Sequence, residues 1–307
     1  TSGIQLWGDI CATTGNLADL YSFREQVAMG VATKVCGEFG IITKAMCRET
    51  KNKLPHELST YEAILRFWEY EQNTNHATFG RAFAALTHAE KLEPDCCIIL
   101  GCLAILYGTI YSLDIPGFEN PLDKAVQCAE RSATLNPNNQ RVLAIHALIR
   151  FTSNDFGAAA LEAHRALELN PHSLFVLDGL AWILTLSGDW ENGPRLAKRA
   201  ISFNPFHRAV AHDALWVNYL RQGKYELAYE ESCSHQRSNL FWDPLMKASS
   251  LALAGRREES AKWAEKLLEL KPDFPVKGRM LVGNYIKFDE VFDRVLDGLA
   301  QAGVSVE

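Results

Sequence analysis

The sequence predicts an all-α protein in which helical hairpins stack into a right-handed solenoid. The main observation is a triplet of an apolar residue, one spacer and proline that recurs along the 307-residue chain. Its prolines lie 43, 34, 34 and 67 residues apart, so the unit has about 34 residues, with one insertion of nine and one missing proline. A fixed period of this length is typical of stacked helix–turn–helix units. The triplets are Leu92-Glu-Pro94, Leu135-Asn-Pro137, Leu169-Asn-Pro171, Phe203-Asn-Pro205 and Leu270-Lys-Pro272.

A second observation is a short turn inside each strong unit, which begins with asparagine or glycine. Both residues tolerate the positive φ that ends a helix, and the residues after them start a new helix. The sequence therefore predicts two helices joined by a tight turn in each unit. The turns begin at Asn154, Gly188, Gly223 and Gly255.

The third observation is a stripe of small residues on the second helix of each unit. In one unit Ala159, Ala163 and Ala166 share a face, and in the next the stripe is Gly193, Ala197 and Ala200. Small side chains let two helices approach closely where they cross. The proline then follows the helix end, where it cannot continue the helix and biases its predecessor away from the α conformation.

This pattern resembles the tetratricopeptide repeat (TPR) family over residues 63–272. The resemblance implies an α–α superhelix of about six helix pairs. Two departures concern local packing: Trp216 stands where a small residue is expected, and the unit at 209–240 lacks its terminal proline. The family's small positions correspond to Ala147, Ala159, Ala166, Ala181, Gly193 and Ala200, and its first-helix tyrosine to Tyr107 and Tyr219.

The long interval of 43 residues predicts a loop around Ser112–Pro121 that protrudes from the array. The stretch Cys96–Leu113, just before it, contains no charged residue for eighteen positions. That length is near the lower limit for a membrane-spanning helix. Because no Lys or Arg anchor flanks it and it keeps the repeat register, we expect a buried solenoid helix and no membrane insertion.

The two ends depart from the repeat, so we expect three segments: a non-repeat element at 1–50, the solenoid at 51–274 and capping helices at 275–307. Residues 4–11 alternate like a strand, and Asn16 can cap a helix over Leu17–Cys36. A lone strand is unstable, so we expect it to pair with a sheet or with a second copy of the chain in a homodimer. Phe288–Ala302 predicts an amphipathic helix that covers the last repeat.

These flanks carry a second resemblance, to a segment of some larger bacterial signalling proteins. The matching runs are Gly3-Ile-Gln-Leu-Trp-Gly-Asp9, Asp19-Leu-Tyr-Ser-Phe-Arg-Glu-Gln-Val-Ala28 and Asp297-Gly-Leu-Ala-Gln-Ala-Gly303. In those proteins the segment closes a TolB-like α/β domain before a TPR array, which follows a class III nucleotide cyclase or a winged-helix DNA-binding domain. The resemblance implies that this chain is the C-terminal regulatory part of such a protein.

Composition narrows the function class further. With 31 basic and 37 acidic residues the net charge is −6, and no Lys/Arg run is present, so direct nucleic-acid binding is disfavoured. The eight cysteines form no Cys-x-x-Cys pair, and the chain is too long to need disulfide staples. We therefore expect reduced thiols in a cytoplasmic protein.

No sequence motif indicates catalysis, a metal site or a cofactor. The chain lacks the glycine-rich nucleotide loops, the Gly-x-Ser-x-Gly elbow and the His-Glu-x-x-His zinc motif. His207 and His212 are five residues apart, which on a helix places them on different faces. His146 and His164 lie on opposite helices of one unit and could approach each other. The pairs Glu230-Glu231 and Glu258-Glu259 are expected on solvated faces or turns.

The TPR resemblance also predicts a binding surface, because first helices in that family line the concave groove at recurring offsets. A mixture of aromatic and acidic residues with one arginine suits a peptide that has apolar anchors. Alternatively, Trp182 and Trp242 pack against a neighbouring helix or the cap. The Lys/Asn clamp used for C-terminal carboxylates is not evident. The predicted groove residues are Phe175, Asp178, Trp182, Asp213, Val217, Arg221, Trp242 and Leu245.

Three functions follow, in decreasing order of support. The first is a regulatory interaction module of a bacterial signalling protein that binds a partner peptide or protein, or self-associates. The second is a free-standing homo-oligomeric adaptor. The third is an enzyme with an unrecognised site.

Overall fold

The computed structural model describes residues 23–24, 27–28, 31, 35, 40–171, 173, 176–203, 207–234 and 240–307. Helices are the regular elements throughout this part of the chain, which contains no strand. They are α2 (Ile41–Thr50), the 3₁₀ turn η2 (Pro55–Glu57), α3 (Thr60–Gln72), α4 (His76–Leu92), α5 (Cys97–Ser112), α6 (Pro121–Leu135), α7 (Gln140–Thr152), α8 (Phe156–Leu169), α9 (Leu177–Leu186), α10 (Asn192–Phe203), α11 (Val210–Arg221), α12 (Tyr225–Ser234), α13 (Trp242–Leu253), α14 (Arg257–Leu270), α15 (Phe274–Gly283) and α16 (Asp289–Gln301).

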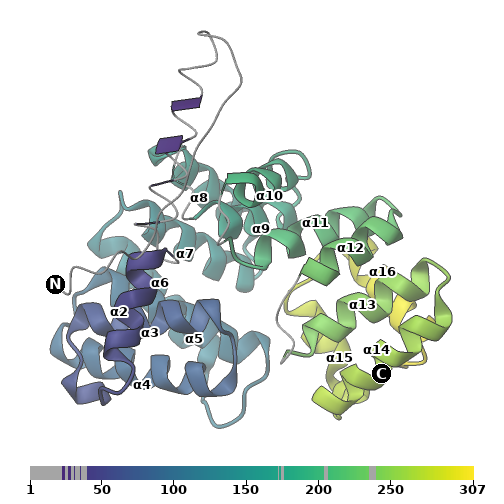
Figure 1. Ribbon diagram of the computed structural model, residues 1–307, viewed down its shortest axis with the longest axis horizontal. Coiled ribbons are helices and arrows are strands. Elements are labelled where there is room, and N and C mark those ends of the chain that lie inside the picture. Colours follow the sequence, from purple (N-terminus) through teal and green to yellow (C-terminus); the bar gives the residue numbers. More distant parts are fainter. Residues whose placement is uncertain are drawn as a thin grey trace.

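Consecutive helices pair as antiparallel hairpins, and the pairs follow one another around an arc (Figure 1). The six pairs from α3/α4 to α13/α14 form the array. Successive first helices contact each other from α3 through α5, α7 and α9 to α11, whereas α11 and α13 both contact α16 and are joined by a hydrogen bond between Trp216 and Ser250. This arrangement confirms the predicted all-α, TPR-like solenoid. The apolar stretch of α5 lies in the core of the array, as its place in the repeat register predicts. No helix in the described part of the chain has the length and apolar character needed to cross a membrane.

The small residues lie where the two helices of a hairpin cross. Ala159, Ala163, Ala166, Ala197 and Ala200 are completely or almost completely buried. Gly193 of α10 is closer still: a Cβ atom there would lie 2.5 Å from the backbone nitrogen of Thr185 in α9. Because real Cβ contacts are never that short, only glycine permits this crossing.

The hairpin turns have the predicted left-handed backbone. The φ angles are 65° at Asn154, 93° at Gly188, 70° at Gly223 and 81° at Gly255. The chain reverses at these four positions because asparagine and glycine accept this conformation at low cost.

Trp216 occupies a small-residue position without disrupting the array. Its side chain is buried, and its Nε1 donates a hydrogen bond to Ser250 Oγ over 2.9 Å. Ser250 lies on α13 and is completely buried. The indole is thus matched by a small polar residue in the next repeat.

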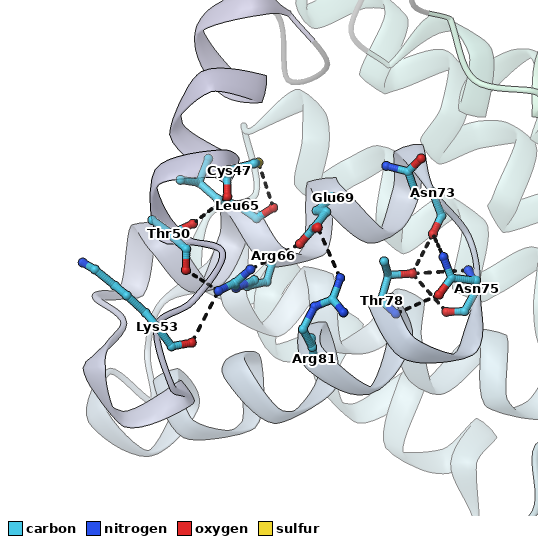
Figure 2. Close-up of polar contacts among 10 residues, drawn as sticks. All are labelled: Cys47, Thr50, Lys53, Leu65, Arg66, Glu69, Asn73, Asn75, Thr78 and Arg81. Carbon is cyan, nitrogen blue, oxygen red and sulfur yellow. Dashed lines mark hydrogen bonds and ion pairs between the residues drawn. The ribbon is translucent and has the colours of Figure 1, made fainter. Parts of the chain in front are cut away.

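Before the array, α2 packs on α3, and Arg66 of α3 links the two (Figure 2). This buried guanidinium donates to the carbonyl oxygens of Thr50 and Lys53 and forms an ion pair with Glu69. The predicted strand at 4–11 lies outside the described residues. Within the predicted helix Leu17–Cys36, the six described residues are helical, but the remainder lies outside them.

The nine-residue insertion lies between α5 and α6, as predicted, but the expectation that it simply protrudes is wrong. Asp114 pairs with Lys277 of α15, and Asn284 donates to the carbonyl oxygen of Ser112 over 3.3 Å. Phe118 packs edge-on against Phe83 of α4. The loop is therefore held between an early repeat and the C-terminal helices.

The C-terminal helix α16 covers α13, the first helix of the last repeat, as predicted, and it also contacts α11. Gly298 permits close contact, because a Cβ there would lie 2.6 Å from the Ser249 carbonyl oxygen. Arg294 donates to the last carbonyl oxygens of α11, at Leu220 and Arg221. A single amphipathic helix therefore covers helices of two successive repeats.

Candidate functional site

The inner face of the array encloses a cavity of about 190 Å³. Four consecutive first helices, α3, α5, α7 and α9, supply most of its wall, and the segment after α15 closes it on another side. Because roughly 10–15 Å³ is the least that one water needs, a cavity of this size has room for several waters or for a large apolar side chain. Most of its lining is apolar, including Phe67, Ile105, Ala144, Leu148, Val176, Trp182, Ile183, Val210 and Tyr285.

A buried charge cluster, with Arg208 at its centre, forms part of the wall of this cavity, which we call the larger cavity. Arg208 comes from the linker before α11, and its Nη2 and Nε donate to the two carboxylate oxygens of Asp178 over 2.7 and 3.1 Å. Its Nη1 donates to both carboxylate oxygens of Glu71, 137 residues away in sequence, over 3.0 and 2.9 Å. One guanidinium thus links α3, α9 and the linker by charge-assisted hydrogen bonds.

The local sequence around Asp178 positions its ion pair with Arg208. Asp178 lies in the first turn of α9, where a negative charge is favoured, and it also accepts from the backbone N–H groups of Gly179 and Arg208. A Cβ at Gly179 would lie 2.9 Å from Arg208 Nη2, so the glycine leaves room for the guanidinium.

The cluster shifts the pKa of its members. Burial by itself would raise the pKa of Asp178, but the charge and hydrogen bonds of Arg208 outweigh it and hold that pKa below its ordinary value. Burial likewise opposes the charge of Arg208, yet Asp178 and Glu71 raise the pKa of its guanidinium. Both groups are therefore ionised at neutral pH, and the pair is a structural one.

A second arginine, Arg141, lines the same cavity from the first turn of α7. Asn139 caps that helix by accepting from the backbone N–H groups of Arg141 and Val142. The Arg141 guanidinium stacks over the Trp68 ring, with 5.5 Å between Cζ and the ring centroid. Burial, followed by the neighbouring charge of Arg208, lowers the pKa of Arg141 to about 9. Two arginines here face two carboxylates, so the formal charges balance.

A smaller cavity of about 70 Å³ adjoins the larger one, since Trp182, Val210 and Tyr285 line both. We call it the aromatic chamber. Its walls are Trp182 of α9, Trp216 of α11, Trp242 of α13 and Tyr285, together with Asp213, Val210, Leu240 and Met246. Trp242 and Tyr285 meet edge to face with 5.0 Å between ring centroids.

The structure brings only some of the predicted groove residues to these cavities. Trp182 lines both of them, and Asp213 and Trp242 line the aromatic chamber. Asp178 holds Arg208, a lining residue. Val217 and Leu245 are completely buried in the core, Arg221 stacks on Trp190 at 4.6 Å, and Phe175 lies outside the described residues. Peptide binding by the set remains a prediction.

Sequence reasoning missed several residues of the site. Five residues that line the larger cavity carry no periodic signal: Glu71, Arg141, Arg208, Asn284 and Tyr285. Three of them, Arg208, Asn284 and Tyr285, lie in connecting segments, and Glu71 and Arg141 come from repeats distant in sequence. Trp216 was signalled by its departure from the small-residue pattern.

The expectation that His207 and His212 lie on different helix faces is wrong. Their Nε2 atoms are 3.0 Å apart, because His207 precedes α11 and the helical phase does not apply to it. His212 Nδ1 is 2.7 Å from a carboxylate oxygen of Glu231, so Glu231 is not simply solvated as expected. Within the described residues, no three His, Cys, Asp or Glu side chains are placed to hold a metal ion.

His146 and His164 do not meet either. His146 Nδ1 is 3.7 Å from Glu162, and His164 Nε2 is 3.1 Å from Asp189, so each faces a carboxylate of its own. Burial lowers the pKa of His146. These are local pairs outside the two cavities.

No protein-family model matches the sequence, and the comparison with curated proteins finds no match. Among solved structures, the human IFIT1 dimer with m7Gppp-AAAA is similar in fold, at a TM-score of 0.60 and 14% identity, over 94% of this chain and 67% of that one. A tetratricopeptide repeat protein from Parabacteroides merdae matches at a TM-score of 0.49 and 16% identity, over 92% and 97% of the two chains. YrrB, a TPR protein with a peptide-binding site, matches at 0.38 and 14%, over 64% and 95%. At these identities the likeness concerns the fold.

Proposed function

We propose that this chain is a protein-interaction module that binds a segment of a partner protein on its inner face. The observation that carries the proposal is the larger cavity, where four successive first helices converge on one mostly apolar hollow. Binding sites are typically concave, largely apolar and furnished with a few placed polar groups. Here those groups are Arg141, Thr109 and Asn284.

The hollow suits an extended peptide that inserts one or two large apolar side chains. Buried apolar and aromatic anchors supply most of the free energy of such interfaces. An apolar cavity of roughly 150 Å³ holds a benzene molecule, so a cavity of about 190 Å³ has room for a large apolar side chain. The polar lining groups would then pair with the peptide backbone.

A protein ligand is favoured over a polyanion. The human IFIT1 dimer structure holds m7Gppp-AAAA, a ligand with a chain of three phosphates. In this chain Arg208 already donates to two carboxylates, and the net charge is −6. The inner face therefore offers little positive potential for several phosphates.

The test is a peptide selection followed by a cavity-filling variant. Peptides from a random library that bind the wild-type protein should lose affinity by on the order of tenfold or more when Ala144, which lines the larger cavity, is replaced by phenylalanine. Ala261→Phe on the exposed face of α14 is the matched control and should leave binding unchanged. Equal binding to the Ala144→Phe protein would reject the larger cavity as the peptide site.

We also propose that the array is the regulatory C-terminal part of a bacterial signalling protein in the cytoplasm. The support is the N-terminal run Gly3-Ile-Gln-Leu-Trp-Gly-Asp9 with the segment at 19–28, which resembles the junction between a TolB-like domain and such an array. A cyclase or winged-helix domain encoded upstream in the same reading frame would agree with this context, and a stop codon directly upstream would contradict it.

The alternative is a free-standing homo-oligomeric adaptor, in which the N-terminal element at 1–50 pairs with a second copy. Sedimentation of the full chain, compared with Trp182→Ala and Trp242→Ala variants, separates the two modes of assembly. Self-association through the inner face would weaken in both variants, whereas pairing through the N-terminal element would persist.

A further inference from the structure

We infer that the aromatic chamber binds an organic cation with a quaternary ammonium group. This goes beyond the proposed peptide site, because it concerns the smaller cavity and a different ligand chemistry. The observation behind it is the composition of the wall: three tryptophans and a tyrosine surround a hollow of about 70 Å³ together with one carboxylate, Asp213.

The walls supply the attraction that such a cation needs. An aromatic face carries negative electrostatic potential, and a cation within about 6 Å of the ring centroid is stabilised, most strongly by tryptophan and most strongly when desolvated. Trp182, Trp216 and Trp242 are each at most 8% exposed, so a cation among them would be well shielded from water. A quaternary ammonium is favoured over a primary one because it is weakly hydrated and has no N–H groups that require partners.

The size of the chamber fits the same group. The chamber of about 70 Å³ is several times larger than the roughly 10–15 Å³ that one water needs, so it has room for a small head group. A trimethylammonium head group with its attached methylene has five heavy atoms. Trp182, Val210 and Tyr285 line both cavities, so the rest of the ligand can extend into the larger one.

In the described part of the chain, no lysine or arginine stacks on the three tryptophans of the chamber. Where lysine and arginine stack on aromatic rings in the described part of the chain, they use other rings: Arg141 uses Trp68, Arg221 uses Trp190 and Lys247 uses Trp263. None lies over Trp182, Trp216 or Trp242 within that part.

A second, independent observation is the indole N–H of Trp242. It is buried and has no hydrogen-bond acceptor among the described residues, although its side chain is only 7% exposed. Trp216 differs, since its N–H is bonded to Ser250. A buried donor without an acceptor costs free energy, and an oxygen atom on the ligand, such as a hydroxyl or carboxylate near the ammonium, would satisfy it.

The test compares two ligands of the same shape on the unmodified full chain. Choline carries a trimethylammonium group, and 3,3-dimethyl-1-butanol carries the neutral tert-butyl group in its place. Calorimetric titration should show choline binding on the order of tenfold more tightly. Glycine betaine and a peptide with trimethyl-lysine, against the same peptide with unmodified lysine, distinguish a small-molecule source from a protein source.

Variants locate the site. Asp213→Asn should weaken choline binding severalfold and leave the neutral analogue unchanged, and Trp242→Phe should weaken both choline and betaine. Trp263→Phe, on α14 outside both cavities, is the control and should bind as the unmodified chain does. Thermal melts test whether each variant is folded. If a variant is unfolded, the comparison of choline with its neutral analogue on the unmodified chain still tests the inference.

Two results would overturn the inference. Equal affinity for choline and its neutral analogue would make the chamber an ordinary apolar pocket. Absence of saturable binding by any of the ammonium ligands up to about 50 mM would make it closed interior packing. Neither result bears on peptide binding in the larger cavity, which the Ala144→Phe variant tests separately.

Discussion

Asp178 and Asp213 occupy the same position in successive repeats, ten residues before the turn glycines Gly188 and Gly223, yet their surroundings differ. Asp178 stands in a charge cluster, where Arg208 joins it to Glu71. Asp213 stands in the aromatic chamber, beside Trp182, Trp216 and Trp242. The repeat directs both carboxylates to the inner face, but residues from the linker and from other repeats decide what each one meets.

The difference separates two uses of a buried charge. At Asp178 the protein supplies its own cation, so the larger cavity is held in shape by an internal ion pair. Asp213 stands beside aromatic side chains, which would attract a cation bound in the chamber. The first arrangement favours rigidity and the second suits the ligand inferred above, and three predictions test this contrast.

The largest expected effect comes from Arg208→Met. Removing one partner from a buried ion pair leaves uncompensated charge, here on both Asp178 and Glu71, and such losses destabilise by about 3–5 kcal/mol. Urea unfolding monitored by circular dichroism measures the loss.

The matched control is Arg256→Met. Arg256 also bonds to two carboxylates, Glu226 and Glu259, but on the solvent-exposed surface, so its loss should change stability little. Equal destabilisation by the two variants would contradict the structural role given to the buried cluster.

A smaller effect is expected on the chamber side from Ser250→Ala. This change leaves the buried Trp216 Nε1 without its acceptor, which should destabilise the protein by about 1–2 kcal/mol. Ser249→Ala is the control, since the Ser249 hydroxyl bonds only to carbonyl oxygens of its own helix, and it should be nearly neutral. Thermal or urea unfolding of the two variants tests whether the hydrogen bond to Ser250 stabilises the buried Trp216 side chain.

The smallest effect is on acid stability. Because the pKa of Asp178 is lowered in the folded state, its stabilisation is complete above its ordinary value near 3.8 and is lost as the pH falls below it. Between about pH 5 and pH 3 the unmodified chain should lose up to about 1 kcal/mol more free energy of unfolding than Asp178→Asn. Other carboxylates with lowered pKa, such as Asp189 and Asp273, are common to both proteins and cancel. If the free energy of unfolding falls equally with pH in the two proteins, protonation of Asp178 does not contribute to the loss of stability in acid.

The sequence predicted the scaffold well, because the features that build it are local. The turn at Gly188, the close crossing at Gly193 and the helix over 97–112 each depend on residues a few positions apart, and all have the predicted form. The binding face was predicted less completely. Trp182, Asp213 and Trp242 line the cavities, whereas Val217 and Leu245 at equivalent offsets are buried in the core.

Helix periodicity thus determined the fold class, the hairpins and their turns. These features depend on backbone conformation and on spacings of three to seven residues, which can be read from one sequence. The cavities depend on contacts that no short spacing encodes: Arg208 with Glu71, Asn284 with the loop after α5, and Tyr285 with Trp242. These side chains come into contact only in the folded superhelix, where distant repeats and the C-terminal cap lie side by side. As a result, paired charges line the larger cavity and aromatic side chains line the smaller one.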